Sequence, residues 1–593
     1  MTVKLEQLVD EVLETDFLII GGGLVGLMAA LSARREGNMD VAIMEKATIE
    51  YGGDCIGLDH HVVEHPGIIE HPIPKDFSKE QAAKGEFGVK RLHGLTSINL
   101  AVAEAKSYVK PLALMEEIGV KLREDDGTVK LVQTQKVKGG PTWNRLVRDA
   151  EGKATGDKIF YRGADLKEKL AGAVLKSGAR VFNRTMLTGL IVKDNTVVGA
   201  TGLNIRTGKF LLFKAKTVLI STGGMSRLYT YPYASFPNNL FYARNFSGNH
   251  GGGVAAAYRA GAKLANMEFV HVYPIVAGSM ATGAAGGGMY WKMMNSRGEF
   301  LEEKYKDKSL KDVGGGFPGT NYTYSPSMTE AEIERDVITS DSSQATDDEV
   351  IACYFTAANE FPRTLKMFKL RGDIRWGPVE IRPFIIGPLT AASGIALVND
   401  RAETSIKNLF AAGSTACATG SSGSKAVVWG YMIGEHVRKL TAGMESPAFG
   451  PDQVQQVAGE RKRVFSPLEN KGKTDSLELE HYIRVTNDNY IGIRKIAPRL
   501  KRAAEIMQMA REKAVPALGA SNYHELMRCL EVQDIIDLSE MHAMSALART
   551  ESRMLPSHYR LDYPQMDDKN WAGLIVTIQK VDGETKYSRE KVE

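Results

Sequence analysis

The sequence predicts an α/β protein that begins with a Rossmann-like unit, in which a helix joins two parallel strands. Residues 17–20 are an apolar run of the kind that forms a buried parallel strand. The glycine pattern GxGxxG follows, residues 24–35 continue as an apolar helical segment, and the stretch DVAIMEK supplies a second strand that ends at Glu45. This order of elements is typical of a dinucleotide site. The weaker alternative is a glycine-rich turn without a ligand.

The residues of this motif have separate physical tasks. Gly21 permits the tight turn, Gly23 lets the backbone approach a pyrophosphate, and Gly26 lets the helix pack closely against the strand. The first amides of the helix face the phosphates. Glu45 lies about 20 residues beyond the glycines, where its carboxylate can accept hydrogen bonds from ribose hydroxyls. The cofactor-binding residues expected in this part of the chain are Gly21, Gly23, Gly26, Glu45, Lys46, Gly52 and Gly53.

Two later segments indicate FAD rather than NAD. Residues 214–224 read as a strand that ends in Thr-Gly-Gly, and residues 404–417 read as a turn, a strand and a loop of small residues. Spaced in this way after the N-terminal unit, they are typical of an FAD-binding fold, in which the late loop approaches the ribityl chain and the flavin. Glycines and serines permit close backbone contact there. The further residues expected to bind FAD are Thr222, Gly223, Gly224, Gly413, Ser414, Ser421 and Ser422.

The composition favours a cytoplasmic globular protein. The chain has 593 residues, 43% of them hydrophobic, and a formal net charge of +4, which is too small to indicate a nucleic-acid or membrane surface. Its four cysteines are widely separated and form no CxxC, so we expect no cluster, no other metal site and no disulfide framework. The polar N-terminus lacks the apolar core of a signal peptide, and no apolar stretch is long enough to predict a membrane span.

Several longer motifs carry a resemblance to a known family. In them the chain resembles the succinate dehydrogenase/fumarate reductase flavoproteins, and the adenylylsulfate reductase α-subunit branch looks most similar. The motifs are GGGLVG, GNHGGGVAAAYRAGAKLANMEF, MNSRGEFLEEKY, IERDV, NLFAAGS and TESRMLPSHYRLDYPQMDDKNW. The resemblance implies a Rossmann-like FAD-binding domain with an inserted α+β capping domain and a C-terminal helical domain. The implied boundaries are 1–255 and 375–445 for the FAD-binding domain, 256–374 for the cap, 465–555 for the helical domain and 556–593 for the tail.

The resemblance also implies where catalytic groups lie, and the chain departs from the family there. Arg335 matches the arginine that acts as acid or base in the dicarboxylate enzymes. The alternative is a surface arginine paired with Glu332 or Asp336. Tyr273 stands where a His-Pro-Thr histidine grips a carboxylate, and Pro383 replaces a second histidine. With two donors missing, succinate or fumarate would be poorly paired, so we expect a different substrate.

Other family features are also changed. The stretch VHVYPIVAG lacks the arginine of the adenylylsulfate reductase site, and Leu389 stands where that branch has a late histidine. Glycines in EYGGDCIGLDHH replace the Ser-His-Thr that links to flavin in dehydrogenases, so we expect non-covalent FAD. His60 and His61 follow this segment as functional or structural histidines, and Arg382 is a candidate to meet an anionic substrate or a flavin phosphate. Further candidates around the pocket are Tyr242, Arg244, His250, His271 and Lys292.

We therefore expect an FAD-dependent oxidoreductase that transfers a hydride between the flavin and a small organic substrate other than succinate or fumarate. The expected catalytic residues are Arg335, Tyr273, His61 and Arg382. The resemblance implies a separate ferredoxin-like iron–sulfur protein, and hence a hetero-oligomer, because the chain has no cluster ligands of its own. One alternative is the α subunit of adenylylsulfate reductase. The other is a non-catalytic flavoprotein that only transfers electrons, in which the missing histidines mark a silent site.

Overall fold

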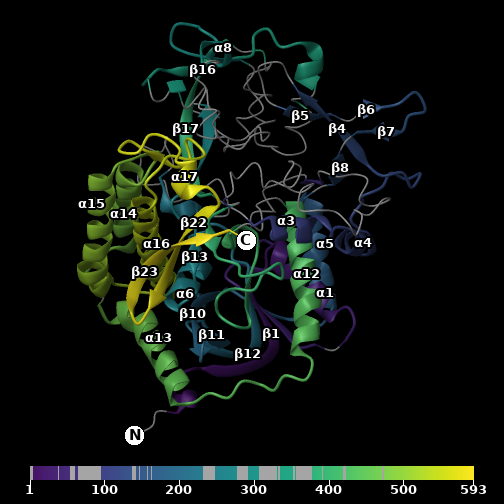
Figure 1. The fold of residues 1–593 in the computed structure, drawn as a ribbon. Coiled ribbons are helices and arrows are strands. Elements are labelled where there is room, and N and C mark those ends of the chain that lie inside the picture. The colour runs from purple at the N-terminus through teal and green to yellow at the C-terminus, as the bar shows by residue number, and fades with distance from the viewer. Residues whose placement is uncertain are drawn as a thin grey trace.

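The fold is that of a computed structural model, drawn in Figure 1. The residues that it describes are 4–37, 39–53, 61–63, 95, 97–136, 142–145, 147–156, 158–161, 163–230, 248–276, 292–305, 330–331, 334–351, 354, 375, 377–389, 392–417, 423–470 and 473–592.

Among the described residues, a seven-stranded sheet forms the centre of the molecule. Its strands are β1 (Glu11–Ile20), β2 (Val41–Glu45), β9 (Arg180–Asn183), β10 (Thr185–Lys193), β11 (Thr196–Asn204), β12 (Phe210–Ile220) and β19 (Leu409–Ala411). The strand order is β10-β11-β12-β1-β2-β9, with β19 paired to β12 off this path. β1 runs parallel to β2 and β12, whereas β10, β11 and β12 pair antiparallel.

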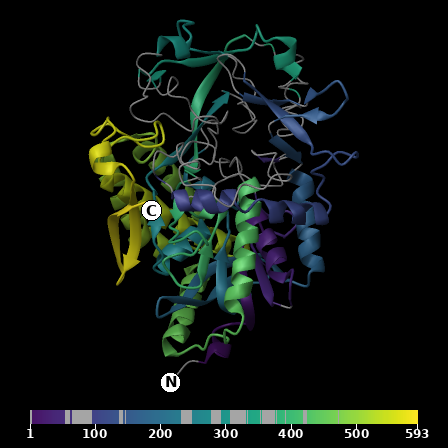
Figure 2. The ribbon, with the colours of Figure 1, turned by 45° about the vertical axis from the view of Figure 1, so that its right-hand side comes forward.

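The sheet separates a hydrophobic core on each face, because successive side chains of a strand point to opposite sides. Phe17 and Ile19 of β1 pack with α1 (Leu24–Arg34), α5 (Gly163–Lys176) and α12 (Gly423–Thr441). Leu18 and Ile20 belong to the other core, which also contains α6 (Gly252–Arg259). Figure 2 shows α12 beside α1 on one face of the sheet. Burial on both faces explains why the sequence of β1 ends as an uninterrupted apolar run.

Smaller sheets surround this centre. β16 and β17 lie at the end of the molecule opposite the N-terminus (Figure 1). The sheet orders are β14-β17-β16-β15, β18-β13-β22-β23 and β3-β8-β4-β5, with the pairs β20-β21 and β6-β7. Their bounds are β3 (His61–Val63), β4 (Leu131–Lys136), β5 (Thr142–Arg145), β6 (Val147–Arg148), β7 (Ala154–Thr155), β8 (Lys158–Tyr161), β13 (Leu264–Ala265), β14 (Val270–Val276), β15 (Lys292–Met294), β16 (Ile338–Asp341), β17 (Val379–Pro388), β18 (Gly394–Ile395), β20 (Arg494–Lys495), β21 (Tyr559–Arg560), β22 (Leu574–Val581) and β23 (Glu584–Lys591).

A group of helices from the C-terminal part covers one flank of the molecule (Figure 1). They are α13 (Pro451–Asn470), α14 (Ser476–Tyr490), α15 (Ala497–Met509) and α16 (Tyr523–Ala548). Asp475 caps α14 by accepting the N–H groups of Leu477 and Glu478, and Asn522 caps α16 in the same way. α16 is buried along most of its length because it packs against α6, α14 and α15. The remaining α-helices of the described chain are α3 (Ile98–Ala105), α4 (Val109–Glu117), α8 (Leu301–Lys304) and α17 (Asp568–Trp571).

These observations confirm the predicted α/β class and the helical C-terminal part. β1 begins earlier than the apolar run indicates, at Glu11, and α1 ends at Arg34. The domain boundaries remain predictions: the one after residue 255 falls within α6, and β17, beyond residue 374, pairs with β14 and β16. Within the part of the chain that the structure describes, no helix combines the length and the apolarity needed to cross a membrane.

Candidate functional site

A pocket lies at the carboxyl ends of β1, β2 and β12, which is where open α/β sheets bind ligands. It contains about 1160 Å³ of empty space, part of it open to solvent. The walls come from the β1–α1 turn, the end of β2, the start of β10, the end of β12, the loop before α6, the residues after β19 and the start of α12. Segments as far apart in the chain as Ile20 and Ala426 therefore meet here, and we call this the cofactor pocket.

The glycines of the β1–α1 turn differ in what a side chain would meet at each position. Gly21 has a φ of +104°, and a Cβ there would lie 2.4 Å from the Ser221 carbonyl oxygen. A Cβ at Gly26 would lie 2.1 Å from the Gly21 carbonyl oxygen, so only glycine lets α1 pack this closely. Of the atoms that the structure describes, a Cβ at Gly23 would meet only the Ser221 oxygen, at 3.9 Å. Gly23 therefore keeps open a space on the pocket side that a side chain would fill.

Glu45 ends β2 with its carboxylate held by backbone donors. One oxygen accepts the Gly22 N–H at 2.7 Å and the other accepts the Ala47 N–H at 2.7 Å. Gly52 packs so close that a Cβ there would lie 2.6 Å from the Glu45 carboxylate. A carboxylate oxygen has more than one acceptor site, so both oxygens keep capacity for ribose hydroxyls. The structure thus places Glu45 in the pocket lining, oriented before any ligand arrives.

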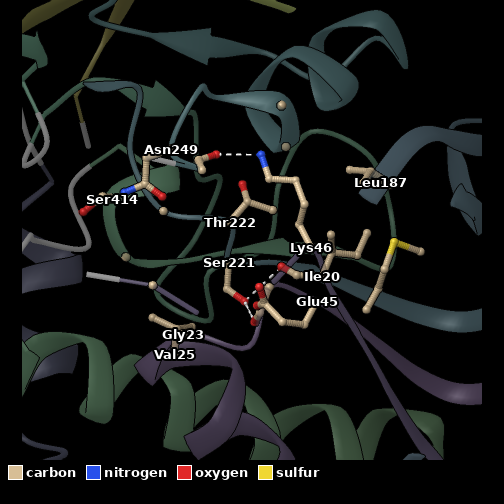
Figure 3. Close-up of a pocket in the computed structure, with 18 of the residues that line it drawn as sticks. Ile20, Gly23, Val25, Glu45, Lys46, Leu187, Ser221, Thr222, Asn249 and Ser414 are labelled. Carbon is tan, nitrogen blue, oxygen red and sulfur yellow. Dashed lines mark hydrogen bonds between the residues drawn. The ribbon is translucent and has the colours of Figure 1, made fainter. Parts of the chain in front are cut away.

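Lys46 extends toward the loop at Asn249, while Glu45 lies on the other side near Ser221 (Figure 3). The Lys46 ammonium donates to the Gly248 carbonyl oxygen at 2.9 Å and contacts His250 Nδ1 at 3.0 Å. Both Lys46 and His250 line the pocket. The structure therefore places His250, a candidate from the sequence, in the lining of this pocket.

The opposite wall is formed by small residues after β12 and β19. Gly223 and Gly413 have φ values of +80° and +72°, conformations that favour glycine. Thr415 Oγ1 donates to the Gly223 carbonyl oxygen at 3.1 Å and joins the two loops. The Thr222 hydroxyl oxygen is buried at the pocket without a hydrogen-bond partner among the described residues. A buried hydroxyl without a partner is uncommon, and a bound ligand would supply one.

Lys167 of α5 is a functional candidate that the sequence did not reveal. Its side chain is buried, and its ammonium donates to the Gly22 carbonyl oxygen inside the glycine turn. The lysine thus supports the turn by holding the Gly22 carbonyl oxygen. No local pattern marks Lys167, because it lies in an ordinary helical segment far along the chain. Thr185, Met186 and Leu187 of β10 also line the pocket without any glycine or charge signal in the sequence.

FAD fits this set of residues. The glycine turn gives backbone access for a diphosphate, and Glu45 offers acceptors for ribose. Thr222 supplies a hydroxyl that has no hydrogen-bond partner among the described residues. Of the expected cofactor residues, Gly21, Gly23, Glu45, Lys46, Gly53, Thr222, Gly223, Gly413 and Ser414 line the pocket. Gly26, Gly52 and Gly224 neighbour the lining in the chain, and Ser421 and Ser422 lie outside the described residues.

The expected substrate residues gather partly on a pair of strands. In the β14–β17 register, Tyr273 is paired with Phe384, Pro274 with Pro383 and Ile275 with Arg382. The two segments that depart from the family pattern are therefore neighbours in one sheet. The side chains of Tyr273, Pro383, Arg382 and Lys292 lie outside the described part of the structure, so their catalytic roles remain predictions.

The remaining candidates are placed as follows. Arg335 is exposed in a turn before β16, with a φ of +59°. The neighbouring Asp336 accepts two backbone N–H groups, that of Val337 at 2.8 Å and that of Ser296 at 3.2 Å. His61 lies in β3, where it pairs with Tyr161. His271 is buried in β14. The candidates Tyr242, Arg244, His60 and Glu332 lie outside the described residues, as does the side chain of His61.

A second group of ionisable residues is buried where α16 meets the C-terminal segment. Burial lowers the pKa of Lys495 to about 7, with Arg560 adding to the effect and Glu268 opposing it. Its ammonium donates to the Ser557 carbonyl oxygen at 3.3 Å. Burial and Lys495 also hold the pKa of His542 and of His558 well below the usual histidine value. No cluster of His, Cys, Asp or Glu that could hold a metal occurs within the described ranges.

Comparison with known proteins agrees with this site. A family model described as FAD binding domain matches residues 16–425, and one described as fumarate reductase flavoprotein C-term matches residues 481–593. An uncharacterized FAD-dependent oxidoreductase of Methanocaldococcus jannaschii is 26% identical over 582 residues, which cover 95% of this chain and 96% of the relative. One subunit of the fumarate reductase (CoM/CoB) from Methanothermobacter marburgensis is 24% identical over 593 residues, with 96% and 98% covered.

Solved structures share the fold at low sequence identity. Adenylylsulfate reductase from Archaeoglobus fulgidus matches with a TM-score of 0.80 at 20% identity, over 98% of this chain and 96% of that chain. A quinol fumarate reductase variant from E. coli matches with a TM-score of 0.73 at 20% identity, over 98% and 97%. Together with the matched family models, these findings identify the protein as an FAD-dependent oxidoreductase. The chain belongs to the flavoprotein family of fumarate reductase and succinate dehydrogenase.

Proposed function

We propose that this protein is the flavoprotein subunit of an oxidoreductase whose substrate is a small organic molecule other than succinate or fumarate. Non-covalently bound FAD would supply the hydride chemistry. The chain's own residues would bind the cofactor in the pocket described above, orient the substrate beside it and supply a proton donor or acceptor. Tyr273 and Arg335 are the side chains proposed for the last two tasks.

The observation that carries this proposal is the combination of a pocket that keeps the expected cofactor-binding features with altered substrate positions. The pocket keeps the glycine turn, Glu45 and the loops of small residues after β12 and β19. The two positions at which dicarboxylate enzymes are expected to have histidines read Tyr273 and Pro383 instead, on strands that pair with each other. Proline has no side-chain donor, so a second carboxylate would remain unpaired at this place.

An iron–sulfur protein is the proposed electron partner. The relative from Methanothermobacter marburgensis is named as one subunit of a fumarate reductase, which supports an enzyme of several subunits. The chain has four cysteines and no CxxC. Cys417 and Cys529 are buried, and burial raises the pKa of Cys417 to about 12 and that of Cys529 to about 11. These two thiols are therefore poorly suited to ligate a cluster as thiolates.

Turnover measurements with an artificial electron carrier test the substrate proposal. FAD-loaded protein is mixed with a reduced viologen dye and a panel of enones, short unsaturated acids and fumarate, and dye oxidation is followed without oxygen. The reverse direction uses an oxidised dye with the saturated compounds and succinate. We expect turnover with at least one non-dicarboxylate and none with fumarate or succinate. Turnover with fumarate at a rate comparable to the best substrate would refute the proposal.

Two variants assign the proposed proton donor. Arg335→Gln should abolish turnover and leave FAD binding unchanged, whereas Arg297→Gln, an exposed arginine beside Glu299, should leave both unchanged. If Arg335→Gln retains full turnover, the alternative of a surface arginine is correct. Adenylylsulfate is added to the same panel. Turnover with adenylylsulfate and with no other compound would instead indicate the α subunit of an adenylylsulfate reductase. Bound FAD with no turnover in any mixture would indicate a flavoprotein that only transfers electrons.

A further inference from the structure

Helix α16 reaches the cofactor pocket from outside its wall. Glu531 Oε1 lies 2.8 Å from the Lys46 ammonium, and Asp534 Oδ2 lies 3.1 Å from His250 Nε2. Residues three apart share one face of a helix, so the two carboxylates of α16 lie on the same side, Glu531 against Lys46 and Asp534 against His250. Neither carboxylate lines the pocket. They therefore act on a bound cofactor only through Lys46 and His250.

Each carboxylate also binds an arginine on its other side. Glu531 Oε2 accepts from Arg227 at 2.7 Å, and Asp534 Oδ1 accepts from Arg259 at 2.7 Å. The Glu531 and Asp534 side chains are only 2% and 3% exposed. Burial alone would raise the pKa of Glu531, but Arg227 and Lys46 hold it well below the usual glutamate value. A charged Glu531 is thus the form that the surroundings favour.

Two glycines let α16 come this close to the loop before α6. A Cβ at Gly251, which has a φ of +88°, would lie 2.3 Å from Leu538 Cδ1. A Cβ at Gly252 would lie 3.0 Å from Asp534 Oδ2 and 2.5 Å from His250 Nε2. Side chains at these positions would push the helix away from the pocket. The run of glycines after His250 therefore serves the contact with α16 as well as the start of α6.

In one tautomer of His250, three acceptors hold the Lys46 ammonium. When His250 donates its Nε2–H to Asp534, Nδ1 is left to accept from the Lys46 ammonium. The Gly248 carbonyl oxygen, 2.8 Å from Nδ1, then accepts from Lys46. A proton on Nδ1 would instead place an N–H 3.0 Å from the ammonium. With Gly248, His250 and Glu531 as acceptors, all three ammonium protons are used, so Lys46 acts on a ligand as a fixed positive charge.

We propose that Glu531 and Asp534 are positioning residues for FAD, which hold Lys46 and His250 so that a fixed positive charge faces the anionic cofactor. A lysine without these partners would lose side-chain entropy on binding and would present its charge in many positions. This inference requires only that FAD binds in the cofactor pocket, and it does not depend on the substrate or on the electron partner. Its test is made without substrate, so it can fail while the proposed function stands.

The test measures FAD affinity by titrating flavin fluorescence with apoprotein. Glu531→Gln should weaken binding about tenfold, the loss expected for one charge-assisted contact. Lys46→Met should weaken it to a similar extent, and the double variant should lose little more, because Glu531 acts through Lys46. Glu531→Asp keeps the charge and should restore most of the affinity. The matched control is Glu540→Gln, on the same helix, where the carboxylate binds Arg511 away from the pocket.

Asp534→Asn provides an independent route if Glu531→Gln does not fold. It leaves the Lys46–Glu531 pair intact and should weaken FAD binding about threefold through His250. The same change in a His250→Asn background should have no further effect. Circular dichroism of the apoproteins reports folding. Wild-type affinity in Glu531→Gln, or losses that add fully in the Lys46 double variant, would overturn the proposal.

Discussion

Gly23 and Gly26 belong to one motif, yet the structure predicts that alanine fails at them for different reasons. Gly23 has φ −73° and ψ −172°, which alanine adopts without strain, and its Cβ would meet one atom of the described residues, at 3.9 Å. Gly26 lies inside α1, where a Cβ would stand 2.1 Å from the Gly21 carbonyl oxygen and 3.0 Å from Ile19 Cγ2. Alanine should therefore block the ligand at Gly23 and disrupt the protein at Gly26.

The magnitudes follow from these contacts. Gly26→Ala forces a backbone shift in a closely packed turn, and overpacking of this kind costs roughly 1–3 kcal/mol of folding free energy. Gly23→Ala should leave the unfolding free energy of the apoprotein within about 0.5 kcal/mol of the wild type. Its methyl group would prevent the close approach of the diphosphate to the turn. Loss of one hydrogen bond to a charged group corresponds to about 10- to 100-fold weaker FAD binding.

Urea unfolding of the apoproteins and FAD titration separate the two effects. Gly23→Ala should change only the titration, and Gly26→Ala should lower the unfolding midpoint as well. Gly37→Ala is the matched control, because a Cβ there meets no atom of the described chain within 4 Å. If Gly23→Ala binds FAD as tightly as the wild type, the diphosphate does not approach this turn. If Gly26→Ala is fully stable, the steric reasoning is wrong.

Three further predictions concern buried polar groups. Lys495→Met removes a base whose pKa falls from 10.5 to about 7 on folding. Because the unfolded chain binds the extra proton, the unfolding free energy of the wild type should rise by roughly 1.4 kcal/mol per pH unit from pH 7 to 10. Urea unfolding at pH 7 and 9 should show this rise in the wild type and not in the variant; an equal rise in both proteins would contradict the prediction. Lys167→Met should weaken FAD binding about tenfold, because the glycine turn loses the donor to Gly22; unchanged titrations would reject this role. Thr222→Val should leave the apoprotein as stable as the wild type or about 1 kcal/mol more stable. The variant should nevertheless bind FAD more weakly, since among the described residues the Thr222 hydroxyl has no partner and the ligand would supply one. Tighter FAD binding would show that the Thr222 hydroxyl contacts no ligand.

The sequence by itself determined the nucleotide-binding unit and hence the fold class. Strand, glycine turn and helix are adjacent in the chain, and the steric demands at Gly21 and Gly26 are local, so residue type reveals them directly. Glu45 is found for the same reason, because one helix separates it from the turn. The altered residues Tyr273 and Pro383 are also visible in the sequence, through the resemblance to the family.

Only the tertiary structure decided which distant charges meet at the pocket. Lys167 holds the glycine turn from α5, and Glu531 of α16 holds Lys46 across 485 residues of chain. The spacing of Glu531 and Asp534 in the sequence predicts that they share one face of a helix, but it does not identify the basic residues that they contact. That choice depends on how α16 packs beside α6, which is set by shape and burial over many residues. The surroundings of the cofactor therefore follow from long-range packing, because burial makes a charge depend on whichever opposite charge the fold brings within hydrogen-bond distance.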